Sequence, residues 1–311
     1  MLRNLEHAGD PWGRGASKRM EWAEPLDFEV RVFGDNGEEK IPDDVEYLFW
    51  VGCAGSLDEG AQRTTRAVAT LLQQAGVSFM VLGGAETCTG DSARRIGNEF
   101  LFQMLAQQNV ETLNEAGAKR IVVTCAHCFN ALANEYPQLG GNYEVIHHST
   151  LLADLVATKR LTPVEPVEAR ITYHDACYLG RHNRIFVPPR EVLGAIPGTK
   201  VTEMDRRMER SFCCGAGGAR MWMDENLGTR VSHNRAAEAL STKPDVVTAA
   251  CPFCIVMLTD GVAGAQADRG EPDGAVEVSD ISEILLRSVL VPDALVPDTT
   301  PHLDSLEGTT T

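Results

Sequence analysis

Short apolar runs alternate with amphipathic stretches between residue 46 and residue 289 of this chain. The runs EYLFWVG (46–52) and ARITYHDA (169–176) are rich in aromatic and β-branched residues, and each leads to a cysteine, which predicts buried strands. Helical spacing of apolar residues predicts helices over residues 61–74, 91–116 and 221–240. Because strand and helix alternate, the pattern favours an α/β fold with mainly parallel sheets flanked by helices.

The same order of elements occurs twice, so the chain is an internal repeat. Four predicted strand regions of the first half correspond to four of the second. The matched pairs are residues 46–52 with 169–176, 77–82 with 200–203, 119–124 with 245–250, and 143–152 with 276–285. Ligand sites of parallel α/β sheets gather at the carboxyl ends of the strands, and we expect the functional residues there.

The repeat also predicts how the chain is divided. Charge and proline content identify a linker and a tail, while a polar segment without sustained periodicity precedes the first repeat. The predicted parts are an extended N-terminal arm (1–45), a first cysteine-rich unit (46–157), a linker (158–168), a second cysteine-rich unit (169–289) and a disordered tail (290–311).

Nine cysteines follow the repeat and mark its strand ends. The second half reads C-x35-C-C-x36-C-x2-C and the first C-x34-C-T-x35-C-x2-C, with Thr89 at the position of Cys214. An odd number of cysteines excludes a fully paired extracellular framework, so we expect reduced, cytosolic thiols. The candidate metal ligands are Cys53, Cys88, Cys125, Cys128, Cys177, Cys213, Cys214, Cys251 and Cys254.

Thiolates grouped in this way suit iron-sulfur clusters, because their sulfur is a soft, anionic ligand. A cubane cluster needs four cysteines, so the first half is complete and the second half has one thiolate to spare. Gly90, Gly215 and Gly217 would let backbone N–H groups approach sulfur without a Cβ in the way. His127, inside the first C-x2-C, is a candidate donor to a cluster sulfur.

Other polar residues also lie at predicted strand ends. His174 and Asp175, just before Cys177, are candidate catalytic residues, although a structural role is as common for such a histidine. Glu86 is expected to cap the helix that begins near Asp91.

Two other chemistries remain open for the cysteines. Structural zinc also uses C-x2-C pairs, but each half has only one such pair together with dispersed thiols. The neighbouring Cys213 and Cys214 would be able to form a strained, reducible disulfide.

The charge balance excludes one class of partner. The formal net charge is −16, with 28 Lys and Arg against 44 Asp and Glu, and such a chain repels phosphate backbones. We therefore expect no nucleic-acid partner. No apolar run reaches the length of a membrane span and the first residues lack the apolar core of a signal peptide, which favours a cytoplasmic chain.

The doubled C-x(n)-C-C-G-x(n)-C-x2-C pattern resembles the cysteine-rich CCG domains of the B-type and D-type subunits of heterodisulfide reductase and of glycolate and lactate oxidation iron-sulfur proteins, over about residues 46–290. The segments ETCTGDSARRIGNEFLFQ, VTCAHCFN and SFCCGAGGARMW are similar to actinobacterial membrane iron-sulfur reductases. The resemblance implies [4Fe-4S] clusters, with a four-cysteine site in the first unit. The ligands that it implies for a non-cubane cluster are Cys177, Cys213, Cys214, Cys251 and Cys254.

The resemblance also implies a function. In these reductases electrons pass from electron-transfer flavoprotein toward menaquinone, and a membrane section and a ferredoxin-type domain precede the CCG pair. We expect an electron-transfer subunit of an oxidoreductase, with a flavoprotein donor, ferredoxin-type and membrane partners, and quinone as an indirect acceptor. Such partners would hold it at the inner face of the plasma membrane. The alternatives are a heterodisulfide-reductase-like enzyme acting at a non-cubane cluster, and a zinc-stapled structural or interaction module.

Overall fold

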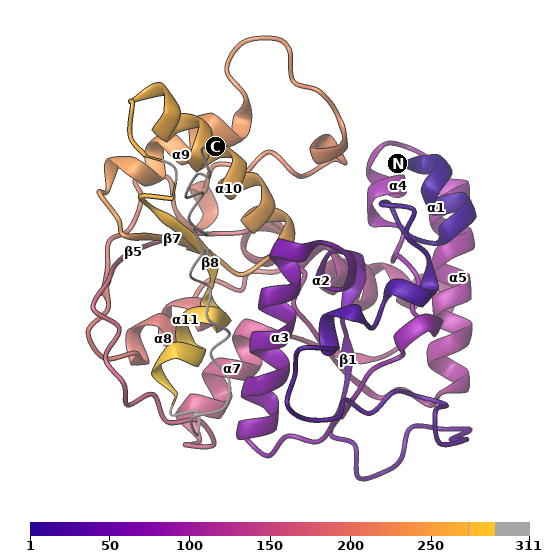
Figure 1. The fold of residues 1–311 in the computed structure, drawn as a ribbon. Coiled ribbons are helices and arrows are strands. Elements are labelled where there is room, and N and C mark those ends of the chain that lie inside the picture. The colour runs from indigo at the N-terminus through magenta and orange to yellow at the C-terminus, as the bar shows by residue number, and fades with distance from the viewer. Residues whose placement is uncertain (273, 290–311) are drawn as a thin grey trace, which may run out of the picture.

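Two four-stranded parallel sheets flanked by helices make up the computed structural model, which describes residues 1–272 and 274–289 (Figure 1). The strands are β1 (Tyr47–Trp50), β2 (Phe79–Met80), β3 (Arg120–Val123), β4 (Glu144–His147), β5 (Arg170–His174), β6 (Lys200–Val201), β7 (Val246–Ala249) and β8 (Glu277–Asp280). The helices are α1 (Leu2–Ala8), α2 (Gly52–Leu57), α3 (Glu59–Gln74), α4 (Asp91–Arg95), α5 (Glu99–Glu115), α6 (Ala126–Asn130), α7 (His148–Ala157), α8 (Pro188–Ala195), α9 (Val231–Ser241), α10 (Pro252–Asp268) and α11 (Ile281–Ser288). The predicted tail, 290–311, lies outside the described residues.

Both sheets have the same strand order, β2-β1-β3-β4 and β6-β5-β7-β8, and every pairing is parallel. The predicted α/β fold with two tandem units is therefore confirmed. In each sheet the winding direction reverses between the first and third strands of the unit, and the carboxyl ends of those strands border the usual ligand crevice. The chain that follows β1, β3, β5 and β7 thus occupies the position where cofactors bind in such folds.

Two predicted helices are shorter than their apolar patterns indicate. The helix predicted over 91–116 is broken into α4 and α5, because Gly97 has a left-handed φ of 87° and the Asn98 side chain caps α5. The helix predicted over 221–240 begins only at Val231. A 3-10 turn and a loop with left-handed Gly228 occupy the preceding residues.

The arm predicted over residues 1–45 packs against the first unit and contains the short helix α1. Leu5 of α1 is buried with Ala93 of α4 and Leu101 of α5. Farther along, the ring of the buried Trp22 packs edge-on against Phe49 of β1, with centroids 6.2 Å apart. The arm therefore contributes to the core, and the boundaries predicted for it and for the two units stay predictions.

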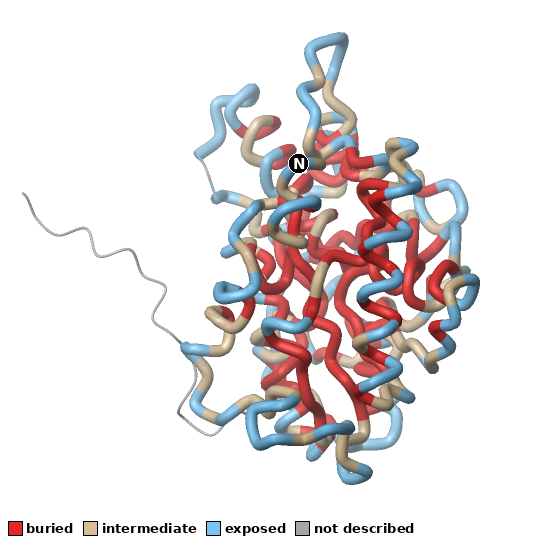
Figure 2. Tube along the Cα trace, turned by 90° about the vertical axis from the view of Figure 1, so that its right-hand side faces the viewer, coloured by how far each residue is buried: buried red, intermediate tan, exposed pale blue. Residues whose placement is uncertain are grey.

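One continuous hydrophobic core runs through both units. Buried residues fill the interior of the molecule and exposed residues lie around them (Figure 2). It includes Leu71 and Val122 of the first unit and Val247 and Ile284 of the second, all with no more than trace exposure. Helix α3 packs against α10 and α11 of the other unit, and α7 packs against α8. The apolar faces of these helices are thus covered only when the two units are together.

A buried polar contact also joins the units. Nε2 of His148, the first residue of α7, lies 3.0 Å from Oδ1 of Asp280, the N-cap residue of α11, and both side chains are fully buried. The same carboxylate oxygen accepts hydrogen bonds from the backbone N–H and the hydroxyl of Ser282. A first-unit histidine therefore supports the start of a second-unit helix.

We predict that His148→Leu lowers the free energy of unfolding by about 3 kcal/mol, because a buried carboxylate loses a hydrogen-bond partner. Urea unfolding at matched metal content measures the change. His7→Leu, at an exposed position of α1, is the control and should leave the midpoint unchanged. An unaltered midpoint in His148→Leu would contradict a stabilising role for this contact.

Candidate metal centre

All nine cysteines are free thiols, and they lie after the strands as predicted. Seven are buried, while Cys177 and Cys213 are partly exposed. Each C-x2-C begins a helix: Cys125 is the N-cap residue of α6 and Cys251 that of α10. Helix N-termini present free N–H groups and a favourable dipole to anionic sulfur.

The five thiols of the second unit form a continuous series of contacts. Cys213 contacts Cys177 and Cys214, Cys214 contacts Cys254, and Cys254 contacts Cys251. Contact with Cys177 lowers the pKa of the Cys213 thiol far below its ordinary value and raises the pKa of Cys177. The five sulfurs are therefore close enough to serve as one ligand set.

Backbone N–H groups of glycines contact the second thiol set. The backbone N–H of Gly215 donates to Sγ of Cys213 over 3.2 Å, and the backbone of Gly217 contacts the same thiol. Gly215 has a φ of 99°, and a Cβ there would lie 3.2 Å from the backbone nitrogen of Ser232. The turn therefore requires glycine at position 215.

The first unit brings together four thiols and one hydroxyl. Cys53 contacts Cys88, which lowers the pKa of Cys53 although burial opposes this, and Cys125 contacts Cys128. The hydroxyl of Thr89 lies 3.9 Å from Sγ of Cys128. All four cysteines line a small cavity together with Thr89, His127, Pro11 of the arm and Phe253 of the second unit.

Gly90 supports the first set from the backbone. It is the N-cap residue of α4 with a φ of 81°, and its backbone contacts the Cys88 thiol. A Cβ at this position would lie 3.0 Å from the Phe102 ring, so the close approach again depends on glycine.

The two thiol sets meet at the interface between the units. Cys125 of the first unit contacts Cys251 of the second. Nδ1 of His127 lies 3.9 Å from Sγ of Cys251, and its ring packs on Tyr178 with centroids 4.3 Å apart. Burial lowers the pKa of His127, but the Cys251 thiolate raises it above the ordinary value. His127 thus contacts a cysteine of the opposite unit.

An arginine of the arm forms a buried ion pair beside the first thiol set. The Arg19 guanidinium donates to Oε1 of Glu86 over 2.8 Å and to Sγ of Cys53 over 3.1 Å. Glu86 also accepts from the backbone N–H groups of Val51 and Gly52. The prediction that Glu86 caps α4 is wrong, because its carboxylate is needed to balance the buried arginine.

The two candidate catalytic residues have different surroundings. Both oxygens of Asp175 accept hydrogen bonds from Arg190, over 2.8 and 2.9 Å, and one also accepts from the Met208 backbone N–H. This geometry favours a structural role for Asp175. His174 instead faces the thiols, and a ring nitrogen of it and the sulfurs of Cys214 and Cys254 lie within 4.8 Å of one another.

Two buried arginines near the thiols are absent from the predicted site. Arg19 lies in a segment without periodicity, so no pattern distinguishes it from the charged residues around it. Arg235 donates from Nε to Nδ1 of His174 over 2.9 Å. It lies on the buried stripe of α9 formed by Ser232, Arg235, Ala236, Ala239 and Leu240, and a charged residue on such a stripe is a signal that sequence alone contains.

The residues present fit a sulfur-ligated metal group. Nine free thiols converge in two connected sets, most of them shielded from water, with backbone N–H groups and an arginine directed at sulfur. Soft thiolate donors in this number suit iron-sulfur clusters and, with fewer ligands, zinc.

Among the described residues, no helix is both long enough and apolar enough to cross a bilayer.

Relatives of this chain share most of its length. It is 42% identical over 293 residues to "Probable iron-sulfur-binding oxidoreductase FadF" of Bacillus subtilis, covering 94% of this chain and 41% of that protein. It is 42% identical over 295 residues to "EtfAB:quinone oxidoreductase" of Syntrophomonas wolfei, covering 92% of this chain and 40% of that protein. It is 34% identical over 286 residues to the D-type subunit of the dihydromethanophenazine:CoB–CoM heterodisulfide reductase of Methanosarcina barkeri, covering 90% of this chain and 65% of that protein.

The chain spans about two-fifths of the length of the first two relatives. The model of the CCG cysteine-rich domain matches it twice, over residues 47–133 and 171–259, and each match extends over the first three strands of one sheet and ends before the fourth. The resemblance that the cysteine pattern indicated is confirmed, and this chain belongs to the CCG cysteine-rich domain family, of which it carries two tandem copies.

Proposed function

We propose that this chain is the electron-transfer part of an iron-sulfur oxidoreductase that receives electrons from a flavoprotein and passes them toward membrane quinone. The observation that carries the proposal is the connected series of thiols, which crosses the unit interface through Cys125 and Cys251. The names of two relatives, "Probable iron-sulfur-binding oxidoreductase FadF" and "EtfAB:quinone oxidoreductase", support it.

Each unit would hold one [4Fe-4S] cluster. Cys53, Cys88, Cys125 and Cys128 provide a four-thiolate site, and the five second-unit cysteines provide a site for a non-cubane cluster. An iron-sulfur cluster supplies a centre that accepts and releases single electrons. The surrounding residues exclude water, and the contact of Cys125 with Cys251 keeps the two ligand sets adjacent.

The chain gives the two sites different electrostatic surroundings. Arg19 places a positive charge against Cys53, and Thr89 replaces a fifth thiolate with a neutral hydroxyl. The second set has one more thiolate and no arginine in direct contact among the described residues. Because positive charge and fewer anionic ligands favour the reduced state, we expect the first site to have the higher potential and electrons to run toward it.

The acidic character of the chain suits docking by charge complementarity. A net charge of −16 would attract basic surfaces of a flavoprotein donor or of ferredoxin-type and membrane partners. Quinone is a membrane lipid, so a chain that delivers electrons toward it would work at the inner face of the plasma membrane through those partners.

Disulfide reduction at the five-thiol set is a second candidate function. It is favoured by the partial exposure of Cys177 and Cys213, which leaves those sulfurs within reach of a substrate. Reduction of a disulfide by the isolated chain, with a chemical electron donor, would support this candidate over a pure electron-transfer role.

We predict that anaerobic reconstitution loads iron and sulfide in about equal amounts and gives electron paramagnetic resonance signals that change on reduction. Iron, sulfide and zinc analysis of the same sample measures the loading. Zinc without sulfide would replace the proposal with a structural module, and a chain that binds neither metal would favour thiol chemistry.

The position shared by Thr89 and Cys214 offers a reciprocal pair of variants. Cys214→Ser should alter only the signal of the second site, whereas Thr89→Cys should shift the first-site signal toward that of the five-thiolate site. Both are read by electron paramagnetic resonance after identical reconstitution. Unchanged spectra in both variants would contradict the assignment of these positions.

Arg19 gives a test of the electrostatic difference between the sites. Arg19→Gln removes a positive charge and a charged donor from Cys53, so the first-site potential should fall while the second-site potential stays the same. Arg19→Lys keeps the charge and is the matched control, with a smaller fall expected. A redox titration followed by electron paramagnetic resonance measures both, and equal shifts at the two sites would contradict a local effect.

A further inference from the structure

A buried histidine of the second unit has one ring nitrogen whose role the proposed electron transfer leaves unexplained. His174 is the last residue of β5 and is 1% exposed. Its Nδ1 is engaged by Arg235, while its Nε2 has no hydrogen-bond partner among the described residues. The sulfurs of Cys214 and Cys254 lie within 4.8 Å of one of its ring nitrogens. A buried polar atom without a partner is costly, so Nε2 requires an explanation.

The neighbouring arginine determines which nitrogen of His174 carries the proton. Nε of Arg235 donates to Nδ1 over 2.9 Å, and a guanidinium can only donate hydrogen bonds. Nδ1 must therefore be the unprotonated, accepting nitrogen. The single proton of a neutral imidazole is then on Nε2. A flipped ring would place a C–H group against the arginine N–H, which excludes the opposite orientation.

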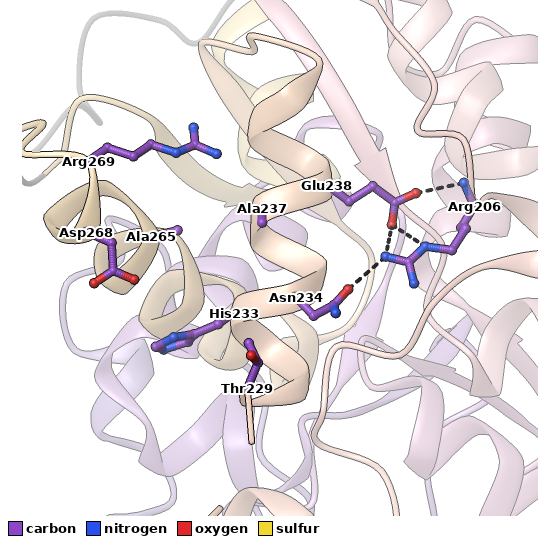
Figure 3. Close-up of a pocket in the computed structure, with 9 residues that line it drawn as sticks. All are labelled: Arg206, Thr229, His233, Asn234, Ala237, Glu238, Ala265, Asp268 and Arg269. Atoms are coloured by element: carbon purple, nitrogen blue, oxygen red, sulfur yellow. Dashed lines mark hydrogen bonds and ion pairs between the residues drawn. The ribbon is translucent and has the colours of Figure 1, made fainter. Parts of the chain in front are cut away.

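Arg235 is itself held in place from the protein surface. It is fully buried and also donates to Oε2 of Glu238 over 2.7 Å and to the Arg206 carbonyl over 3.0 Å. Glu238 in turn accepts from the backbone and the guanidinium of Arg206, both over 2.8 Å (Figure 3). Asn234, on the same helix, accepts from Arg206 as well. Arg206, Asn234 and Glu238 line a surface pocket of about 480 Å³, and no cysteine is among its lining residues.

We propose that His174 is a hydrogen-bond donor to the thiolate sulfurs of Cys214 and Cys254, with its tautomer and direction fixed by Arg235. An Nε2 that carries a proton has no lone pair for a metal, so His174 is not a ligand of iron or zinc. For the same reason it does not accept a proton as a general base. It is a positioning residue that acts on the second-site sulfurs.

The effect on the metal centre follows from the donated hydrogen bond. An N–H group directed at a thiolate withdraws electron density from sulfur and favours the reduced cluster. This consequence rests on the proposed iron-sulfur function, whereas the tautomer does not. The first unit lacks this arrangement, because Trp50 stands three residues before Cys53, where the second unit has His174 three residues before Cys177.

The tautomer can be measured without any cluster. Two-bond ¹H–¹⁵N correlation spectra of the reduced, metal-free chain with ¹⁵N-labelled histidine distinguish protonated from bare ring nitrogens. The signal that disappears in His174→Leu identifies the residue. We expect a bare Nδ1 and a protonated Nε2. A protonated Nδ1 would overturn the proposal, whether or not the chain binds iron.

Variants of the supporting residues test the role of Arg235. Arg235→Leu should allow both neutral tautomers of His174 to form, so that both ring nitrogens show partial protonation. Glu238→Gln should keep the tautomer, because Nε of Arg235 still donates to Nδ1 of His174. This variant can be measured even if Arg235→Leu does not fold. A tautomer that changes in Glu238→Gln and is unaffected by Arg235→Leu would contradict the assignment of Arg235.

The reconstituted chain tests the effect on the second site. His174→Leu should lower the potential of the centre whose signal Cys214→Ser alters and leave the other centre unchanged. His233→Gln is the control, because His233 is two residues from Arg235 on α9 but lines the surface pocket (Figure 3). An unchanged second-site potential in His174→Leu would overturn the donor role. Failure to load iron and sulfide would instead refute the proposed function and leave the tautomer result standing.

Discussion

The contact between Cys125 and Cys251 across the unit interface is the constraint on which the rest of the architecture depends. These two thiols touch only if the carboxyl ends of β3 and β7 are presented to each other. The identical strand orders of the two sheets place each C-x2-C at its own switch point, and the packing of α3 on α10 and α11 holds the two edges together. His127 adds a ring that crosses the same interface. The two thiol sets are therefore neighbours across the interface between the units.

A buried arginine lies near each thiol set, and each arginine is paired with a glutamate. Arg19 with Glu86 contacts Cys53 directly, whereas Arg235 with Glu238 reaches the second set through His174. The arginines come from unrelated places, the N-terminal arm and α9, so the arrangement is not a product of the repeat. Sulfurs that bind a metal would be anionic, and a nearby positive charge would then lower the cost of burying them. The two arginines would supply that charge by different routes, Arg19 directly and Arg235 through His174.

Most of the architecture and the grouping of the cysteines follow from the sequence, because they depend on local patterns. Strand runs ending at cysteines, repeated in the same order, indicate the parallel sheets and the strand ends. The exact helices do not follow, since one glycine at position 97 and the cap at Asn98 break an otherwise continuous apolar pattern. The contacts of His127 and Glu86 depend on tertiary packing. His127 contacts a residue of the other unit and Glu86 a residue of the arm, and no local sequence pattern predicts such contacts. Arg235 is the exception, because its position on an apolar stripe is visible in the sequence.

The shared core has a consequence for how this pair of units is inherited. A duplicated domain often keeps the ability to fold alone and can then be lost, copied or moved separately by recombination. Here α3 and α7 each pack an apolar face against helices of the other copy. A recombination break near residue 160 would therefore leave both fragments with core residues exposed to solvent. The matches to much longer relatives extend over 90% or more of this chain and thus include both copies. The two copies therefore occur together in these relatives.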